Sequence, residues 1–232
     1  MTKRTIVFFA IAVSISPFNN KTWSQEYKYE IGATAGISAY MGDANRTSPF
    51  LNPGFATGIL HRYNLSLNWA VKSNLIVANI SGDTKNAKNV FPMNGQASFK
   101  RTFFELGSQM EYNFFPFSDK FSYLDTKPYT PYIFTGVGAT FATGGHRFFN
   151  LNLPVGIGFK YKFKERFNVG IEFSMRKLLG DDLDVTHKGD VWNLDTPFGI
   201  KSGVFKNKDW YSLTMMHVTW EFGRKYDPCC GP

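Results

Sequence analysis

Residues 151–163 read LNLPVGIGFKYKF, residues 164–166 read KER, and residues 167–177 read FNVGIEFSMRK. In both longer runs, apolar residues occupy every second position, whereas a helix would repeat them every three or four positions. The three polar residues between the runs leave room only for a tight connection. We therefore expect an antiparallel β-hairpin with one apolar face and one polar face, which could belong to a soluble or a membrane sheet.

The N-terminal segment favours the membrane. Two basic residues precede an apolar run at positions 6–15, and the small residues Thr22 and Ser24 lie just before Gln25. This order is typical of a cleavable signal peptide. The apolar run is about half the ~20 residues that a spanning helix needs. We predict a signal peptide over residues 1–24 and a mature chain that starts near Gln25.

Alternating segments recur along the rest of the chain, in which aromatic residues make up 17%. The expected strands cover residues 27–40, 54–64, 69–80, 99–114, 129–143, 151–163, 167–177 and 210–222. Several of them reach the ~9–11 residues of a tilted membrane-spanning strand. We predict one all-β domain over residues 25–222, an eight-stranded antiparallel up-and-down transmembrane β-barrel of the OmpA-like type, and a short tail over residues 223–232.

The even strand number places both chain ends on one side of the barrel. Bacterial barrels of this kind lie in the outer membrane of Gram-negative cells, so we expect outer-membrane lipid around the barrel and both mature termini in the periplasm. Residues 65–68, 115–128 and 164–166 then become periplasmic connections, and residues 41–53, 81–98, 144–148 and 179–209 become extracellular loops. Aromatic residues at strand ends, including Tyr27, Trp69 and Trp220, are expected at the two membrane interfaces.

The polar faces predict what fills the barrel. If the apolar faces meet lipid, ten charged residues point inward: Lys28, Glu30, Arg101, Glu105, Glu111, Lys160, Lys162, Glu172, Arg176 and Glu221. The lumen of an eight-stranded barrel is only wide enough for side chains, and unpaired buried charges are costly. We expect a lumen ion-pair network of Arg101, Glu105, Glu111, Lys160, Lys162, Glu172 and Arg176.

Two other arrangements remain open from the sequence. The lumen could be a narrow polar channel, or a soluble lipocalin-like barrel could turn the same strands inside out. Strand-end aromatics and the exported context favour lipid outside. The facing of residues 54–64 and 69–80 does not follow from their pattern.

The sequence gives little support for catalysis. The four histidines, His61, His146, His187 and His217, lack metal-ligand spacing with one another or with cysteine. No Ser/His/acid pattern stands out, although His187 near three aspartates leaves a lipid-modifying hydrolase as a third hypothesis. We expect no catalytic, cofactor or metal site. The dispersed formal charge of +8 does not predict nucleic-acid binding.

Cys229 and Cys230 form the only cysteine pair, beyond the last expected strand. An oxidising compartment permits disulfides. The two residues could form a vicinal bond, one could make an intermolecular disulfide with a partner, or the tail could be a disordered end that carries thiols. A cysteine pair in a secreted chain makes the partner disulfide worth testing.

The expected periplasmic connection over residues 115–128 is the longest of its kind. It carries Phe117, Phe121 and Tyr123, which are apolar groups without lipid to cover them. They could fold back on the barrel as a lid, or they could contact a partner protein.

Several motifs, in order and spacing, resemble the PorG-like outer-membrane barrel component of the Bacteroidetes type IX secretion system. The motifs are Tyr29 to Gly32, Gly36 to Asp43, Pro131 to Phe134 with Gly136 and Gly138, Asn152 to Gly158, Glu172 with Arg176, and Asp209 to Tyr211. The resemblance runs from the mature start to the last strand.

The resemblance implies a non-enzymatic scaffold that anchors the periplasmic ring of this secretion system, built of a lipoprotein and its partner, to the outer membrane. The alternative is a general small barrel of the OmpA or OmpW type, acting in envelope integrity, adhesion or small-solute passage.

Overall fold

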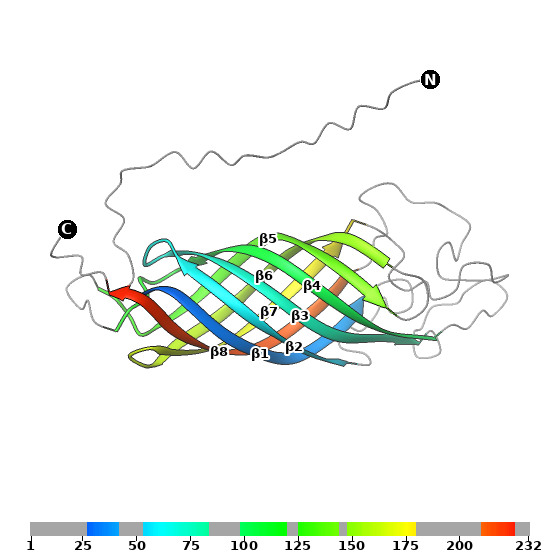
Figure 1. The fold of residues 1–232 in the computed structure, drawn as a ribbon, viewed down its shortest axis with the longest axis horizontal. Coiled ribbons are helices and arrows are strands. Elements are labelled where there is room, and N and C mark those ends of the chain that lie inside the picture. The colour runs from blue at the N-terminus through cyan, green and yellow to red at the C-terminus, as the bar shows by residue number, and fades with distance from the viewer. Residues whose placement is uncertain are drawn as a thin grey trace, which may run out of the picture.

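The computed structural model describes residues 27–41, 53–83, 98–119, 125–143, 148–179 and 210–225 of the 232-residue chain. Their eight strands form one closed antiparallel barrel, in which each strand pairs with its chain neighbours and β8 closes on β1 (Figure 1). The strands are β1 (Tyr27–Met41), β2 (Gly54–Asn64), β3 (Trp69–Asp83), β4 (Ser98–Asn113), β5 (Tyr129–Thr143), β6 (Phe148–Lys164), β7 (Phe167–Leu178) and β8 (Trp210–Lys225). The predicted fold class is confirmed.

The strand bounds lie close to the sequence-based expectation. β2 and β5 have the expected limits, and β8 extends to Lys225, three residues beyond the expected end at 222. The predicted signal peptide, Phe121, Tyr123 and both cysteines lie outside the described residues. Within the described part of the chain, no helix has the length and apolar character needed to cross a membrane.

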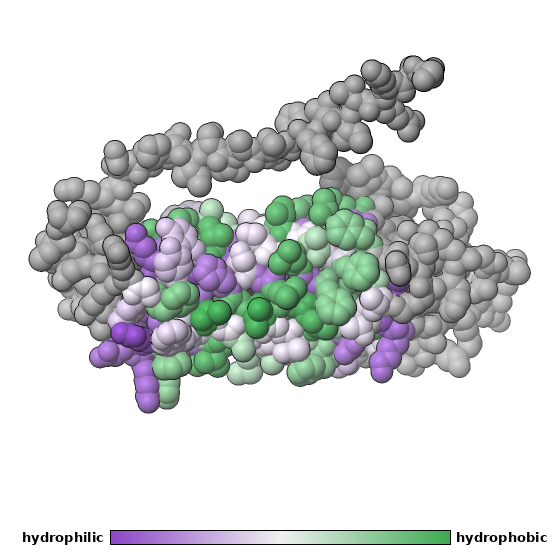
Figure 2. All heavy atoms as spheres, viewed as in Figure 1, coloured by the Kyte–Doolittle hydropathy of each residue, from purple (hydrophilic) through white to green (hydrophobic). Residues whose placement is uncertain are grey.

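The outer face of the barrel is apolar. Large side chains such as Leu106, Val137 and Met216 are 63%, 62% and 66% exposed on it. Figure 2 shows one side of this wall, with hydrophobic residues across its middle and hydrophilic ones gathered toward the ends. A soluble barrel would bury these side chains, so the inside-out alternative is wrong and the barrel is a transmembrane one.

The two ends of the barrel differ. The turn end carries the connections at residues 65–68 and 165–166, the start of β1 and the end of β8; the loop end carries the connections at residues 42–53, 84–97, 144–147 and 179–209. Aromatic rings meet on the outer wall near the turn end. Trp69 lies 4.8 Å from Tyr112, and Tyr29 lies 5.7 Å from Phe222, measured between ring centroids.

Two outward predictions on β1 are wrong. Tyr27 is only 6% exposed, because the register between β1 and β8 shifts between Tyr27 and Tyr29. The guanidinium carbon of Arg166 lies 4.9 Å from the Tyr27 ring centroid. Ala39, near the opposite end of the strand, is 2% exposed. A β-bulge of this kind changes the face on which a residue lies without altering the sequence pattern.

The apolar core lies inside the barrel, toward the loop end. It contains Tyr40, Ala56, Ile76, Ala78, Ile80, Phe103, Ala142, Leu178, Tyr211, Leu213 and Met215. The Phe103 and Tyr211 rings pack with their centroids 4.8 Å apart. We call this set the apolar plug. The sequence analysis predicted only an ionic filling of the lumen, so this plug is a new feature.

Candidate functional site

Glycines on β6 let two aromatic side chains lie flat against the inner wall. A Cβ atom at Gly158 would lie 2.3 Å from Tyr132 Cζ, and one at Gly156 would lie 2.4 Å from Phe134 Cζ. Both aromatic residues come from the neighbouring strand β5, where they pair with these glycines. The alternation of glycine and large side chains fills the lumen without displacing the strands.

The ionic cluster occupies the lumen on the turn-end side of this layer. Glu111 is its centre: Arg62 Nε lies 2.8 Å from its Oε2 atom, Lys72 Nζ lies 3.5 Å from Oε1, and Lys160 Nζ lies 3.6 Å from Oε2. Four strands supply these side chains, and all of them are at most 1% exposed. One carboxylate therefore neutralises the field of three buried cations.

Two further acids complete this cluster. Arg62 Nη1 donates to Glu30 Oε2 at 2.6 Å, and Lys72 Nζ donates to Glu172 Oε2 at 2.6 Å. Neutral donors add to these contacts: Thr219 Oγ1 lies 2.8 Å from Glu30, and Tyr132 OH lies 3.1 Å from Glu172. Charged hydrogen bonds of this length are the strong ones. The cluster is thus neutral overall, with three acids and three bases.

Two separate ion pairs flank the cluster. Near the turn end, Lys162 Nζ lies 2.6 Å from Glu221 Oε1, which also accepts from Asn168 Nδ2 at 2.8 Å. Toward the apolar plug, Arg176 Nε lies 2.6 Å from Glu105 Oε2.

Tyr211 OH also donates to Glu105 Oε2, at 2.6 Å. The structure therefore joins the apolar plug to the ionic filling through the hydroxyl of Tyr211.

The structure places all seven residues of the proposed network inside the barrel. Six of them form printed ion pairs: Glu105, Glu111, Lys160, Lys162, Glu172 and Arg176. Arg101 is 2% exposed, on the inner face of β4 near the loop end. Of the other inward predictions, Glu30 and Glu221 are buried and Lys28 is half-buried.

Sequence reasoning missed three buried lumen residues, Arg62, Lys72 and His217. Arg62 and Lys72 lie on β2 and β3, whose facing the sequence left open, and they are direct register partners. On β3, Lys72 and Asn74 alternate with Trp69, Val71 and Leu75, and this short pattern near the turn could have indicated the inner face.

A group of buried side-chain oxygens gathers around two paired glycines, Gly107 and Gly138. A Cβ atom at Gly107 would lie 2.7 Å from Asn74 Oδ1 and 3.6 Å from Glu105 Oε1, and one at Gly138 would lie 2.7 Å from Asn152 Oδ1. None of these three oxygens has a hydrogen-bond partner among the described residues. Buried oxygens are normally satisfied by ordered water, so this is where the lumen would hold internal water.

Phe117 closes the turn end of the barrel. It is fully buried, its backbone N–H donates to Leu67 O at 3.2 Å, and Lys160 Nζ lies 5.0 Å from its ring centroid. Its position agrees with the lid alternative rather than with an exposed partner contact. Whether Phe121 and Tyr123 contact a partner stays a prediction.

Within the described ranges, no group of three or more His, Cys, Asp or Glu side chains is placed to hold a metal ion. His217 is buried beside Gly170, where a Cβ atom would lie 2.6 Å from His217 Nε2. The acids nearest to the lumen bases are ion-paired. The arrangement therefore offers a packed, neutral interior rather than a reactive centre.

The comparisons with solved structures agree with this fold. Neisserial surface protein A (NspA) is 13% identical, with a TM-score of 0.50, and the match covers 84% of this chain and 97% of that protein. OprG of Pseudomonas aeruginosa is 14% identical over 87% of this chain and 98% of its own, with a TM-score of 0.46. Ail of Yersinia pestis, crystallised with the heparin analogue sucrose octasulfate, is 10% identical over 85% of this chain and 100% of its own, with a TM-score of 0.47.

At these identities, the likeness to NspA concerns the fold alone, which is that of a small outer-membrane barrel. No curated protein sequence matches this chain significantly. A family match extends from the apolar N-terminal run through all eight strands to the last residue. Because residues 6–232 match the family described as domain of unknown function DUF6089, the chain belongs to that family.

Proposed function

We propose that the protein is a non-enzymatic outer-membrane barrel that acts as a membrane anchor and scaffold rather than as a pore. The filling of the lumen carries this proposal. Five acids, Glu30, Glu105, Glu111, Glu172 and Glu221, are paired with five bases, Arg62, Lys72, Lys160, Lys162 and Arg176. The apolar plug stands between this network and the loop end. An ion would have to break buried pairs and then cross an apolar layer.

The orientation of the barrel belongs to the same proposal. The turn end, which carries short connections and both ends of the barrel domain, faces the periplasm, and the loop end faces outward. Outer-membrane barrels have short periplasmic turns and long outer loops. The surfaces available to periplasmic partners are then the turn end and the segments that adjoin it.

The finer proposal is that the barrel anchors the periplasmic ring of the type IX secretion system. It rests on the resemblance of the sequence motifs to PorG-like barrels. Two of these motifs meet in space, because Tyr132 and Phe134 of the β5 motif pack on Gly158 and Gly156 of the β6 motif. This contact supports a shared lumen architecture. The ring lipoprotein and its partner are the proposed binding partners.

Small-solute passage is the main competing function, and conductance measurements separate it from anchoring. We expect the wild-type barrel, reconstituted in planar bilayers, to give no reproducible single-channel steps, because charged pairs and the apolar plug fill the lumen. A porin inserted by the same protocol serves as the control for reconstitution. Reproducible steps from the folded wild-type protein would contradict the anchor proposal and favour passage.

Capture from native membranes tests the secretion assignment. We expect the affinity-tagged barrel to recover a periplasmic ring lipoprotein, and the paired variant Phe121→Ala with Tyr123→Ala to recover less of it. The capture is run with and without reductant. Phe117→Ala is not a suitable probe, because Phe117 is buried and its loss would disturb the barrel. If no ring lipoprotein is recovered with the wild-type barrel, the type IX assignment fails.

The same preparation tests the proposed intermolecular disulfide. Substitution of Cys229 and Cys230 by Ser should abolish any higher-mass band that the wild type shows on a non-reducing gel. A band that persists in this variant would exclude a crosslink through these two cysteines.

A further inference from the structure

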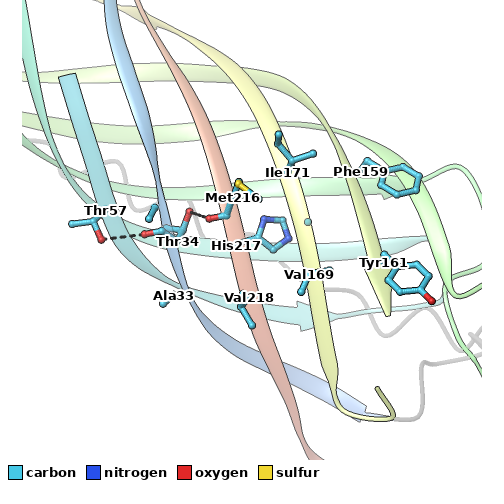
Figure 3. Close-up of a pocket in the computed structure, with 12 residues that line it drawn as sticks. Ala33, Thr34, Thr57, Phe159, Tyr161, Val169, Ile171, Met216, His217 and Val218 are labelled. Atoms are coloured by element: carbon cyan, nitrogen blue, oxygen red, sulfur yellow. Dashed lines mark hydrogen bonds between the residues drawn. The ribbon is translucent and has the colours of Figure 1, made fainter. Parts of the chain in front are cut away.

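A groove of about 630 Å³ runs across the outer wall of the barrel, over β6, β7, β8, β1 and β2 (Figure 3). Phe159 and Tyr161 of β6 stand at one end, and Ala35 and Thr57 of β1 and β2 lie toward the other. The groove faces the space that the membrane fills. We propose that it is a binding site for a phospholipid, with one acyl chain in the groove and an anionic head group at the β6–β7 turn.

Small side chains produce the groove. Ala35 pairs with Met216 on one side and with Thr57 on the other, so a single methyl group lies between two larger neighbours. Ala33 repeats this arrangement between Val218 and Ile59. On the far wall, the outward positions of β5 include Ile133, Val137 and Phe141, which are large and exposed. The depression is therefore local to the β1 side of the barrel.

The groove presents hydrocarbon, although two threonines line it. Thr57 Oγ1 donates to the backbone oxygen of Thr34 at 3.1 Å, and Thr34 Oγ1 donates to the backbone oxygen of Met216 at 3.1 Å. Both hydroxyls are thus satisfied within the wall, as polar groups in lipid must be. An occupant gains nothing from hydrogen bonding here. An acyl chain, which can fill an elongated depression by dispersion contacts, fits this chemistry.

The head-group end is set by charge. Lys164 and Arg166 are exposed at the turn that joins β6 and β7, the two strands that supply one end of the groove. Tyr161 lies three residues before Lys164, roughly 10 Å along the strand. The hydrocarbon of one leaflet is roughly 15 Å thick. A phospholipid whose phosphate meets Lys164 and Arg166 can therefore lay a chain along the groove.

The groove half of the site is tested by filling it. Ala35→Phe places a ring where the chain would lie, and Ala139→Phe makes the same change on the outer face of β5, away from the groove. The folded barrels are titrated with palmitoyl-oleoyl phosphatidylglycerol in detergent and examined by native mass spectrometry. We expect the wild type and the Ala139→Phe variant to retain one lipid. The Ala35→Phe variant should retain it about tenfold less well, a loss that corresponds to about 1.4 kcal/mol.

The charge half is tested with Lys164→Gln and Arg166→Gln together, against Lys127→Gln at a turn-end lysine outside the β6–β7 turn. Each basic residue near an anionic lipid surface contributes modestly. The double variant should lose roughly tenfold in retention of phosphatidylglycerol and little in retention of phosphatidylethanolamine. Free glycerol phosphate should not compete at the concentrations that saturate with lipid, because it has no chain.

Several outcomes would overturn the proposal. Equal retention by the Ala35→Phe and Ala139→Phe variants would show that the groove holds no chain. Loss of a dimer, rather than of a lipid, in the Ala35→Phe spectrum would make the groove an interface between copies. Unchanged retention in the Lys164→Gln and Arg166→Gln double variant would remove the head-group assignment. Heat-modifiable gel mobility confirms that each variant is a folded barrel before the comparison is made.

Discussion

Replacement of Glu111 by Gln should lower the free energy of unfolding by roughly 3–5 kcal/mol, the range for a buried pair that loses one partner. The change keeps the size of the side chain and removes only its charge. Arg62 would keep Glu30 and Lys72 would keep Glu172, whereas Glu111 is the only printed ion-pair partner of Lys160. Three cations would then share two carboxylates inside a closed barrel.

Urea titration of the barrel folded in phospholipid vesicles, followed by tryptophan fluorescence, measures this loss. Glu165→Gln, an exposed acid in the β6–β7 turn, provides the matched control and should change stability by less than about 0.5 kcal/mol. Lys160→Met in the Glu111→Gln background should recover part of the loss, because the unpaired cation is gone. Equal stabilities of the Glu111→Gln and Glu165→Gln variants would show that the cluster does not hold the lumen together.

Substitution of Gly158 by Ala should cost roughly 1–3 kcal/mol, as overpacking of a filled interior does. The added Cβ atom would lie 2.3 Å from Tyr132 Cζ and 2.5 Å from its hydroxyl oxygen. The ring cannot move away freely, because its hydroxyl donates to Glu172 and Lys160 Nζ lies 5.2 Å from its centroid. The strain should therefore spread into the ionic cluster.

A double-mutant cycle isolates this contact. In a Tyr132→Leu background, which shortens the side chain, Gly158→Ala should cost far less than it does in the wild type. The same urea titration gives all four free energies of unfolding. If Gly158→Ala costs the same in both backgrounds, the effect comes from the backbone of β6 rather than from the Tyr132 ring.

The sequence was sufficient for those parts of the barrel that depend on alternation alone. Between Leu151 and Phe163, every second residue faces lipid, and the structure places each of them on the outer wall. The period of two fixes the face of a strand once one side is apolar. The same reasoning placed Glu105, Glu111, Lys160 and Arg176 inside.

Alternation failed where both faces of a strand are apolar or where the register shifts. On β3, Ile76 and Ile80 point into the apolar plug while Leu75 faces lipid, so hydropathy alone could not show the inner side. Tyr27 lies beyond a register shift that no residue type announces. The choice of ion-pair partners was also out of reach, because it depends on how strands far apart in the sequence face each other across the lumen.

The cross-lumen pairs have a consequence for how the barrel enters the membrane. Lys72 and Glu172 are 100 residues apart, and Tyr211 and Glu105 are 106 apart. A hairpin inserted by itself would bring its charged face into hydrocarbon before its partner existed, at a cost of several kcal/mol per ion. Insertion strand by strand is therefore unfavourable for this sequence. The pairing pattern favours a late, concerted closure, in which β8 meets β1 as the charges leave water together.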